Sequence, residues 1–313
     1  MASIAYLGPP GTFSQAALNQ MCAAGLIPGD AAAGHDHLPT DSTPAALEAV
    51  RRGAAQYACV PIENSIEGSV LPTLDSLAIG SALQVYAELT LDVAFSIVVA
   101  PGIHTAAVRT VAAFPVAAAQ VRRWLAEHLP EAVVVPAISN AAAAEDVAAG
   151  RADAGVSTAL AAQLYEVPTL ADGVVDEANA RTRFVLVGLP GRPPERTGAD
   201  RTSVVLRLDN VPGALVTALM EFGIRDIDLT RIESRPTRVE LGTYVFFLDC
   251  VGHIDDSSVA EALKALHRRC ADVRYLGSWP TGTPAGALPP HVDDATDWFE
   301  QLRLGGAEKE DRA

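Results

Sequence analysis

A threonine between two arginines opens an apolar segment near the middle of the chain. The segment ARTRFVLVGLP spans residues 180–190, and its apolar run predicts a buried strand. Thr182 offers a neutral hydroxyl donor, and Arg183 offers a permanent charge whose planar fork suits a carboxylate. A surface arginine at a strand start is the plain alternative. We interpret the strand start, formed by Thr182, Arg183 and Phe184, as a candidate site of chemistry.

Three other stretches place hydroxyl or amide side chains where a strand ends or a helix begins. They are GPPGTFSQ (8–15), PIENSIEGS (61–69) and GVSTAL (155–160). In open α/β sheets, ligands gather at the carboxyl ends of strands, where helix N-termini offer unpaired N–H groups. The candidate binding residues of these stretches are Gly11, Thr12, Ser14, Glu63, Asn64, Ser65 and Ser157.

For any one of these stretches, simple helix capping by Thr12, Ser14, Ser65 or Ser157 is the plainer explanation. Three stretches together, with an arginine nearby, favour a cleft that binds a carboxylate. Glu63 can act as an acid or can hold the turn by hydrogen bonds.

Other patterns that often carry chemistry are weak or absent. His35 and His37 flank an aspartate, but we expect this HDH stretch to be a solvated loop without a metal, because no third ligand is nearby. The sequence has no G-x-G-x-x-G, P-loop or G-x-S-x-G motif, so dinucleotide, nucleotide and serine-hydrolase functions have no support.

Composition narrows the class of partner and the compartment. The formal net charge is −15, which argues against nucleic acid or an anionic membrane surface as partners, because both need a basic face. No apolar run approaches the ~20 residues that span a bilayer. The start of the chain has no basic n-region of a secretory signal, and the four cysteines show no C-x-x-C spacing. We therefore expect a cytoplasmic protein with reduced thiols.

The elements that must position these residues alternate between strands and helices. Strand patterns such as IAYLG (3–8) and YACVPIE (57–63) alternate with helical ones such as STPAALEAVRRG (42–53), which has Pro44 in its first turn. LQVYAELTLDVAFSIVVAP (83–101) predicts one long strand or two consecutive strands. The alternation predicts an α/β fold with mainly parallel strands.

A second domain follows a Pro/Gly-rich linker at residues 190–200. Residues 201–280 show the order βαββαβ, which is the ferredoxin-like arrangement. Residues 281–313 form an acidic, Pro/Gly-rich tail with one short helix expected around TDWFEQLRL. We assign no function to this tail.

In this order and spacing, the motifs resemble those of the prephenate dehydratase family. The resemblance rests on GPPGTFS, VPIENS, the TRF strand and a βαββαβ domain that contains GALV (213–216) and ESRP (233–236), and it covers residues 3–280. No chorismate mutase domain precedes the first strand, so the chain looks like the monofunctional form.

The resemblance implies a catalytic domain at residues 3–189 with two α/β lobes of the periplasmic-binding-protein type. The chain is expected to cross between the lobes near residues 80 and 170, which brings GPPGT, PIENS and TRF together. The implied reaction converts prephenate to phenylpyruvate with loss of CO₂ and water, and it requires neither metal nor cofactor. The corresponding threonine, Thr182, is implied to be catalytic, because the leaving hydroxyl needs a proton or a strong hydrogen bond.

Residues 201–280 are implied to form an ACT regulatory domain that binds L-phenylalanine as an allosteric inhibitor. The implied effector-binding residues are Asn210, Pro212, Gly213, Ala214, Leu215, Val216, Glu233, Ser234, Arg235 and Pro236. Of these, Glu233 and Arg235 are expected to pair and to fix the interface. A homodimer or homotetramer with effector sites between ACT domains is also implied.

Two other functions remain open from the residues. An arogenate dehydratase would act on a substrate with an amine in place of the keto group. A non-catalytic amino-acid sensor would need Arg183 for a carboxylate but no hydroxyl donor at Thr182.

Overall fold

The computed structural model describes residues 2–29, 34–238, 240–282, 286 and 293–305. The chain divides into two compact units, Met1–Arg192 and Pro193–Ala313, so the division falls within the expected linker. The helix expected in the tail is α10 (Asp293–Arg303). Within the described ranges, no helix combines the length and apolar character needed to cross a bilayer.

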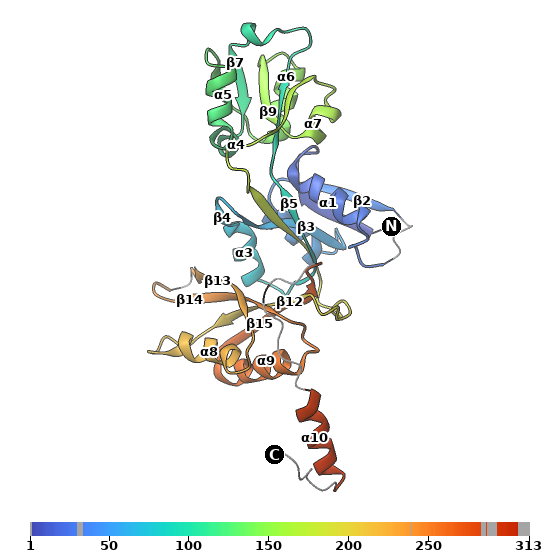
Figure 1. The fold of residues 1–313 in the computed structure, drawn as a ribbon, viewed down its shortest axis with the longest axis vertical. Helices are drawn as coiled ribbons and strands as arrows, with labels where there is room; N and C mark the ends of the chain where they lie inside the picture. The colour runs from blue at the N-terminus through green and yellow to red at the C-terminus, as the bar shows by residue number, and fades with distance from the viewer. Residues whose placement is uncertain (1, 30–33, 239, 283–285, 287–292, 306–313) are drawn as a thin grey trace, which may run out of the picture. The chain divides into compact units, whose positions relative to one another are not determined.

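The first lobe of the first unit is a mixed sheet with the strand order β2-β1-β3-β11-β5, and β4 pairs with β3 (Figure 1). Its strands are β1 (Ala2–Leu7), β2 (His35–Thr40), β3 (Tyr57–Asn64), β4 (Gly68–Ser69), β5 (Gln84–Asp92) and β11 (Arg181–Gly188). Its helices are α1 (Phe13–Ala23), α2 (Thr43–Arg51) and α3 (Leu71–Ala78). Apolar residues of α1 pack on the sheet face that carries Phe184 and Leu186, while α2 and α3 pack against β3 and against each other.

The second lobe is a five-stranded sheet with helices on both faces (Figure 1). Its strands, in spatial order, are β10 (Thr169–Val174), β6 (Phe95–Val99), β9 (Ala154–Ser157), β7 (Thr110–Ala113) and β8 (Val133–Pro136). Its helices are α4 (Pro115–Gln120), α5 (Arg122–His128), α6 (Asn140–Ala148), α7 (Ala159–Leu164) and a 3₁₀ turn at Thr105–Ala107. Side chains of α4 and α5 pack on one face, and those of α6 and α7 on the other.

The chain passes between the lobes from β5 to β6 and returns from β10 to β11. The first passage therefore follows Asp92, later than the position near residue 80 that we predicted. The reason is that the apolar stretch at residues 83–101 forms two strands, and the first of them pairs with β11 in the first lobe. The strands around these passages pair antiparallel, so the prediction of mainly parallel strands is wrong. Only β1 with β2 and β3, and β7 with β8 and β9, pair in parallel among the described strands.

The HDH stretch is also not a loop. His35 and His37 lie in β2, which pairs in parallel with β1 at the edge of the first sheet. In the described residues, no group of three or more His, Cys, Asp or Glu side chains is arranged to hold a metal.

The second unit contains an antiparallel sheet with the order β13-β14-β12-β15. Its elements are β12 (Asp200–Arg207), α8 (Ala214–Gly223), β13 (Leu229–Pro236), β14 (Tyr244–Val251), α9 (Ser257–Arg269) and β15 (Asp272–Pro280). Apolar residues of both helices pack on the sheet around Phe222 and Leu248. The βαββαβ order and this strand order are those of the ferredoxin-like fold.

Candidate active site

Thr182 and Asn64 lie opposite each other on β11 and β3. The Asn64 amide nitrogen donates to the hydroxyl oxygen of Thr182 at 2.9 Å. The amide oxygen of Asn64 accepts the backbone N–H groups of Ile66 and Glu67, at 2.8 and 2.9 Å. These two donors fix the orientation of the amide, because a flipped amide would place its NH₂ group against the N–H groups of Ile66 and Glu67. Thr182 is therefore the acceptor in its bond with Asn64, and its own hydroxyl proton can be donated elsewhere.

The turn after β3 is tied to the start of β11 through Ser65. The Ser65 hydroxyl accepts the backbone N–H of Arg181 at 2.9 Å and donates to the carbonyl of Asn179 at 2.9 Å. The backbone N–H of Ser65 donates to the carbonyl of Arg181. Ser65 thus holds the strand start that carries Thr182, and it does not cap a helix.

The GPPGT loop (residues 8–12) leads into α1 without a side-chain cap. Thr12 occupies the N-cap position of α1, but its hydroxyl donates to the carbonyl of Leu7 at 2.9 Å. The N–H of Gly11 donates to the side-chain oxygen of Gln15 at 2.6 Å. Ser14 lies within α1 and is buried. The first turn of α1 therefore keeps backbone N–H groups that no capping side chain satisfies.

The same loop contacts the second lobe closely. The Thr158 hydroxyl donates to the carbonyl of Gly11 at 2.5 Å and accepts the N–H of Ala161 as the cap of α7. A Cβ atom on Gly11 would lie 3.0 Å from Cβ of Ala161 and 3.3 Å from Cβ of Ala141. Gly11 also has a φ of +90°, so both the space and the backbone favour glycine here. The N-terminal turns of α1, α6 and α7 therefore meet at this loop, and their dipoles add positive potential.

Ser157 and Asn140 lie beside this meeting point. Ser157 is fully buried, and its hydroxyl donates to the carbonyl of Asn140 at 2.6 Å. The capping explanation for Ser157 is thus wrong, because Thr158 caps α7. The side-chain oxygen of Asn140 is buried and has no hydrogen-bond partner in the described part of the chain.

Arg183 lies between two carboxylates. Its Nε and Nη2 donate to Oε2 of Glu63 at 3.1 and 2.8 Å, and its Nη1 donates to Oε2 of Glu88 at 3.2 Å. The side chains of Arg183 and Glu88 are each 8% exposed. Because successive strand residues point to opposite faces, Arg183 lies on the face away from Thr182. The structure does not bring this charge to the Thr182 hydroxyl, and the role of Arg183 as a substrate ligand stays a prediction.

Phe184 points to the same face as Thr182, but it belongs to the hydrophobic core. It is 2% exposed and packs with Leu18 and Met21 of α1. The ring of Phe184 therefore contributes to the core of the first lobe, and its assignment to substrate binding stays a prediction. Phe13 at the start of α1 packs against this cluster and also meets Phe95 of the second lobe edge-to-face, with 5.5 Å between ring centroids.

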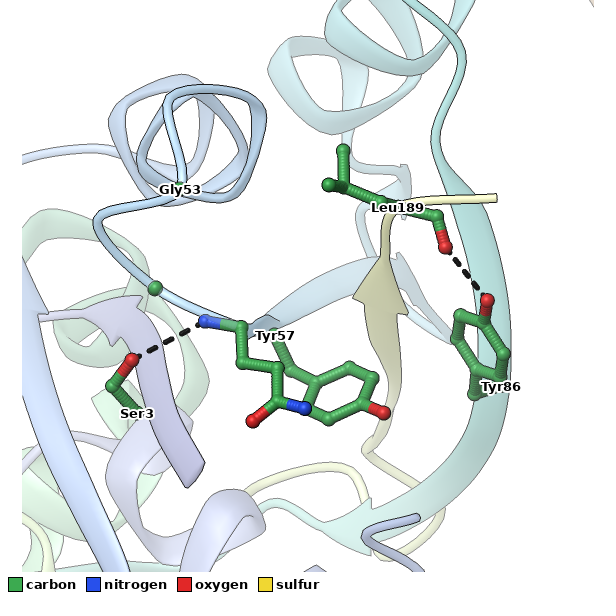
Figure 2. A pocket seen from close by; sticks show the side chains of 7 residues that line it. Ser3, Gly53, Tyr57, Tyr86 and Leu189 are labelled. Carbon is green, nitrogen blue, oxygen red and sulfur yellow. Dashed lines mark hydrogen bonds between the residues drawn. The ribbon is translucent and has the colours of Figure 1, made fainter. Parts of the chain in front are cut away.

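A pocket of about 430 Å³ lies at the other end of the same strands. Figure 2 shows Tyr57 and Tyr86 in its wall, with the Tyr86 hydroxyl donating to the carbonyl of Leu189 at 2.6 Å. Because Gly188 pairs with Tyr57 while Thr182 pairs with Asn64, the pocket and the candidate site are at opposite ends of β11. None of the predicted site residues lines this pocket.

The residues assigned to an effector lie at one end of the sheet of the second unit. Val245 of β14 pairs in the strand ladder with Arg207 on one side and with Arg235 of β13 on the other. Arg207 directly precedes the turn that contains Asn210 and Pro212. Gly213 is the N-cap of α8 with a φ of +81°, and α8 has no side-chain cap. The other assigned residues follow in α8 (Ala214, Leu215, Val216) or lie on β13 (Glu233, Ser234, Pro236).

Three residues at the site were not predicted from the sequence: Glu88, Thr158 and Asn140. Thr158 could have been chosen over Ser157, because a threonine directly before an apolar helical run is a typical N-cap. Glu88 sits in an apolar strand pattern, and a lone carboxylate there is itself a signal that a buried cation is near. No sequence feature distinguishes Asn140 from other helix-start asparagines.

Two α/β lobes linked by two passages, with helix N-termini of both lobes at one loop, give the first unit the two-lobed architecture of the periplasmic-binding-protein type. Comparison with known proteins makes the assignment specific. Residues 4–191 match the family model described as prephenate dehydratase, and residues 202–268 match the ACT domain model. The chain belongs to the prephenate dehydratase family.

Individual relatives agree with this assignment. A prephenate dehydratase of Mycobacterium sp. (strain JLS) is 73% identical over 307 residues, which cover 97% of both chains. The crystal structure of prephenate dehydratase in complex with L-Phe from Arthrobacter aurescens is 40% identical, with a TM-score of 0.86 over 97% of this chain and 100% of that one. A structure described as a novel type of quorum quenching acylase is 30% identical, with a TM-score of 0.78 over 89% and 97%. One fold thus carries two named activities, and activity must be argued from the site.

Proposed function

We propose that this protein converts prephenate to phenylpyruvate, with Thr182 as the residue that assists the departing hydroxyl. The observation that carries the proposal is the bond from Asn64 to Thr182, which leaves the threonine proton available. In the reaction, the ring carboxylate leaves as CO₂, its bonding electrons enter the ring, and the C–O bond at the opposite carbon breaks. The hydroxyl departs as water when it receives a proton, and aromatisation drives the step. A donor held at the strand end lowers this barrier.

The two negative charges of prephenate need local positive potential, since the protein itself carries a formal net charge of −15. We assign this potential to the helix N-termini at the GPPGT loop, above all to α1, which begins without a side-chain cap. Backbone N–H groups of Thr12 and Ser14 would serve as donors there, as helix N-termini do for other anions. Gly11 allows the close contact between lobes, and Ser65 holds the strand start.

Arg183 fits this scheme less directly. A substrate carboxylate would compete for its guanidinium with Glu63, whose side chain is 43% exposed. The structure favours a role for Arg183 and Glu63 in holding β3 against β11.

We further propose that the second unit binds L-phenylalanine and thereby inhibits the enzyme. The relative from Arthrobacter aurescens was solved with L-Phe, and this chain carries the ACT match and the turn at residues 209–213. The space around Gly213 is open, because a Cβ atom at this position would have no neighbouring atom within 4 Å. Such a turn can offer N–H groups to an amino-acid carboxylate, with Asn210 as a side-chain contact.

A second copy of the chain would complete this effector site. Val216 and Met220 of α8 and Ile224 at its C-cap form an i, i+4, i+8 apolar row, and they are 62%, 56% and 65% exposed. β13 lies at the edge of its sheet, where unpaired backbone groups can add a strand from a partner. These features support a homodimer or a homotetramer built on the second unit.

The deciding experiment measures phenylpyruvate formation from prephenate by absorbance, with arogenate as the competing substrate. We expect kcat/KM to favour prephenate. Binding without turnover would indicate an amino-acid sensor, and a preference for arogenate would indicate the amine-bearing substrate. Either result would contradict the proposed function.

A further inference from the structure

Glu88 is a buried carboxylate on β5 that the proposed reaction does not use. It accepts from Nη1 of Arg183 at 3.2 Å, and both side chains are 8% exposed. Glu63 of β3 accepts from Nε and Nη2 of the same guanidinium. One arginine on the central strand β11 thus joins carboxylates of both neighbouring strands. Buried charges of this kind are retained only when they are paired.

The ion-pair cluster of Glu63, Arg183 and Glu88 lies one residue from the site. Arg183 pairs with Glu63 in the ladder, and the next pair is Thr182 with Asn64. The two pairs occupy opposite faces of the sheet, because strand side chains alternate. Any shift of β3 against β11 that opens the ion pairs would therefore also move Asn64 away from Thr182.

The ladder between β3 and β11 is irregular at this point. Arg183 pairs with Glu63 but Phe184 pairs with Pro61, so Ile62 is an extra residue in β3. Such a bulge interrupts the backbone hydrogen bonds and loosens the register locally. Pro61 also lacks an N–H group. Side-chain ion pairs across the three strands would supply the constraint that the interrupted ladder does not.

We propose that Glu88 is a positioning residue: by holding Arg183, it fixes the end of β3 so that Asn64 can orient the Thr182 hydroxyl. This proposal rests on the proposed function for its kinetic consequence only. The positioning role goes beyond the proposed function because it gives Arg183 a partner within the protein, the carboxylate of Glu88 on β5.

Glu88→Gln tests the proposal, since glutamine keeps the size and removes the charge. We expect kcat to fall by roughly 10- to 100-fold, as misplacement of a catalytic group does, while KM changes by less than about threefold. Glu88→Asp keeps the carboxylate and should recover part of kcat. The matched control is Asp92→Asn, which removes an exposed ion pair between Arg181 and Asp92 on the same two strands, 2.8 Å apart; its kcat should equal that of wild type.

Two further measurements separate positioning from general damage. In a Thr182→Ala background, Glu88→Gln should lower kcat little further, because the hydroxyl that Glu88 positions is already absent. Deuterium exchange of peptides covering residues 60–66 and 180–186 should be faster in Glu88→Gln than in Asp92→Asn. This second readout does not depend on turnover, so it tests positioning even if prephenate is not the substrate.

Unchanged kcat and unchanged exchange in Glu88→Gln would overturn the proposal. A full additional loss of kcat in the Thr182→Ala background would overturn it as well, because Glu88 would then act independently of the hydroxyl. Inactive wild-type protein with faster exchange in Glu88→Gln would instead refute the proposed function and leave the positioning role standing.

Discussion

The amide of Asn64 donates to Thr182 while its oxygen accepts two backbone N–H groups of the following turn. The turn thereby decides which way the amide faces, and the amide decides that Thr182 is an acceptor on that side. A threonine that accepts on this side can still donate its own proton to another acceptor. The turn in PIENS thus orients the hydroxyl of Thr182 in TRF through Asn64, although Asn64 and Thr182 are 118 residues apart in the sequence.

Replacing Thr182 tests the donor directly. We expect Thr182→Ala to fold and to lose about 10²–10⁴ in kcat, which is the usual contribution of a positioned proton donor. Thr182→Ser keeps the hydroxyl and should retain more activity, so it serves as the matched control. A kcat of Thr182→Ala near that of wild type would show that another group protonates the leaving hydroxyl.

Asn64→Asp tests the direction of the hydrogen bond rather than the presence of the side chain. A carboxylate can still accept the N–H groups of Ile66 and Glu67, so the turn should persist. It cannot donate to Thr182, and the threonine would then donate its proton to the carboxylate. We expect kcat to fall by at least about tenfold with an unchanged melting temperature. If Asn64→Ala loses activity but Asn64→Asp keeps full kcat, donation from Asn64 to Thr182 is not needed, and the proposed direction of this hydrogen bond is wrong.

The sequence placed the hydroxyl and amide residues at the ends of strands and helices correctly, but it did not predict their hydrogen-bond and ion-pair partners. TRF, PIENS and GPPGT were identified because hydroxyls, amides and glycines at element boundaries depart from the apolar patterns around them. Which face each side chain takes depends on register, and the extra residue Ile62 in β3 could not be read from local propensity. The partner of Arg183 on β5 depends on an antiparallel pairing between strands that are distant in sequence.

The fold was predictable in its parts and less so in its connections. Ser42 and Ser139 cap their helices, and a hydroxyl before an apolar helical run is a signal that a local sequence pattern reveals. The strand at residues 35–40 was missed because HDHLPT has exposed side chains and pairs only at the sheet edge. Its strand character comes from the ladder with β1, which no local pattern reveals.

Arg183→Lys separates the two roles that this arginine could have. An ammonium keeps the charge but cannot donate to Glu63 and Glu88 in one planar fork. We expect kcat to fall while KM stays within about threefold. A rise in KM with kcat preserved would instead show that Arg183 binds a substrate carboxylate.

The buried thiol of Cys250 should make the second unit less stable in alkali. Burial raises the pKa of Cys250 from 9.0 to about 12. Below about pH 9 the thiol is protonated in both states, whereas between pH 9 and 12 the unfolded chain ionises and the folded one does not. The free energy of unfolding should therefore fall by about 1.4 kcal/mol per pH unit in this range from this group.

Urea unfolding at pH 8 and pH 10 measures this effect, with Cys250→Ala as the comparison. The alanine variant has a smaller side chain in the core and should be less stable at pH 8, but it should lose less stability on going to pH 10. Equal losses in both proteins would show that the thiol ionises in the folded state.

The last prediction concerns regulation by the second unit. A protein that ends at Arg192, the boundary of the first compact unit, should keep turnover and lose inhibition by L-phenylalanine. The reason is that an effector can change activity only through a state that it binds more tightly, and the truncated protein lacks the proposed binding turn.

A point substitution makes the same test in the full chain. Gly213→Val puts a branched side chain at a φ of +81°, where only glycine is unstrained, and blocks the backbone approach to the turn. Gly198→Val is the matched control, because Gly198 has a φ of +84° and open surroundings but precedes β12, whereas the proposed turn follows it. Initial rates against phenylalanine concentration should show weakened inhibition for Gly213→Val and normal inhibition for Gly198→Val. If the truncated protein is active and still inhibited normally, the effector binds in the first unit, and the assignment of the turn to phenylalanine is wrong.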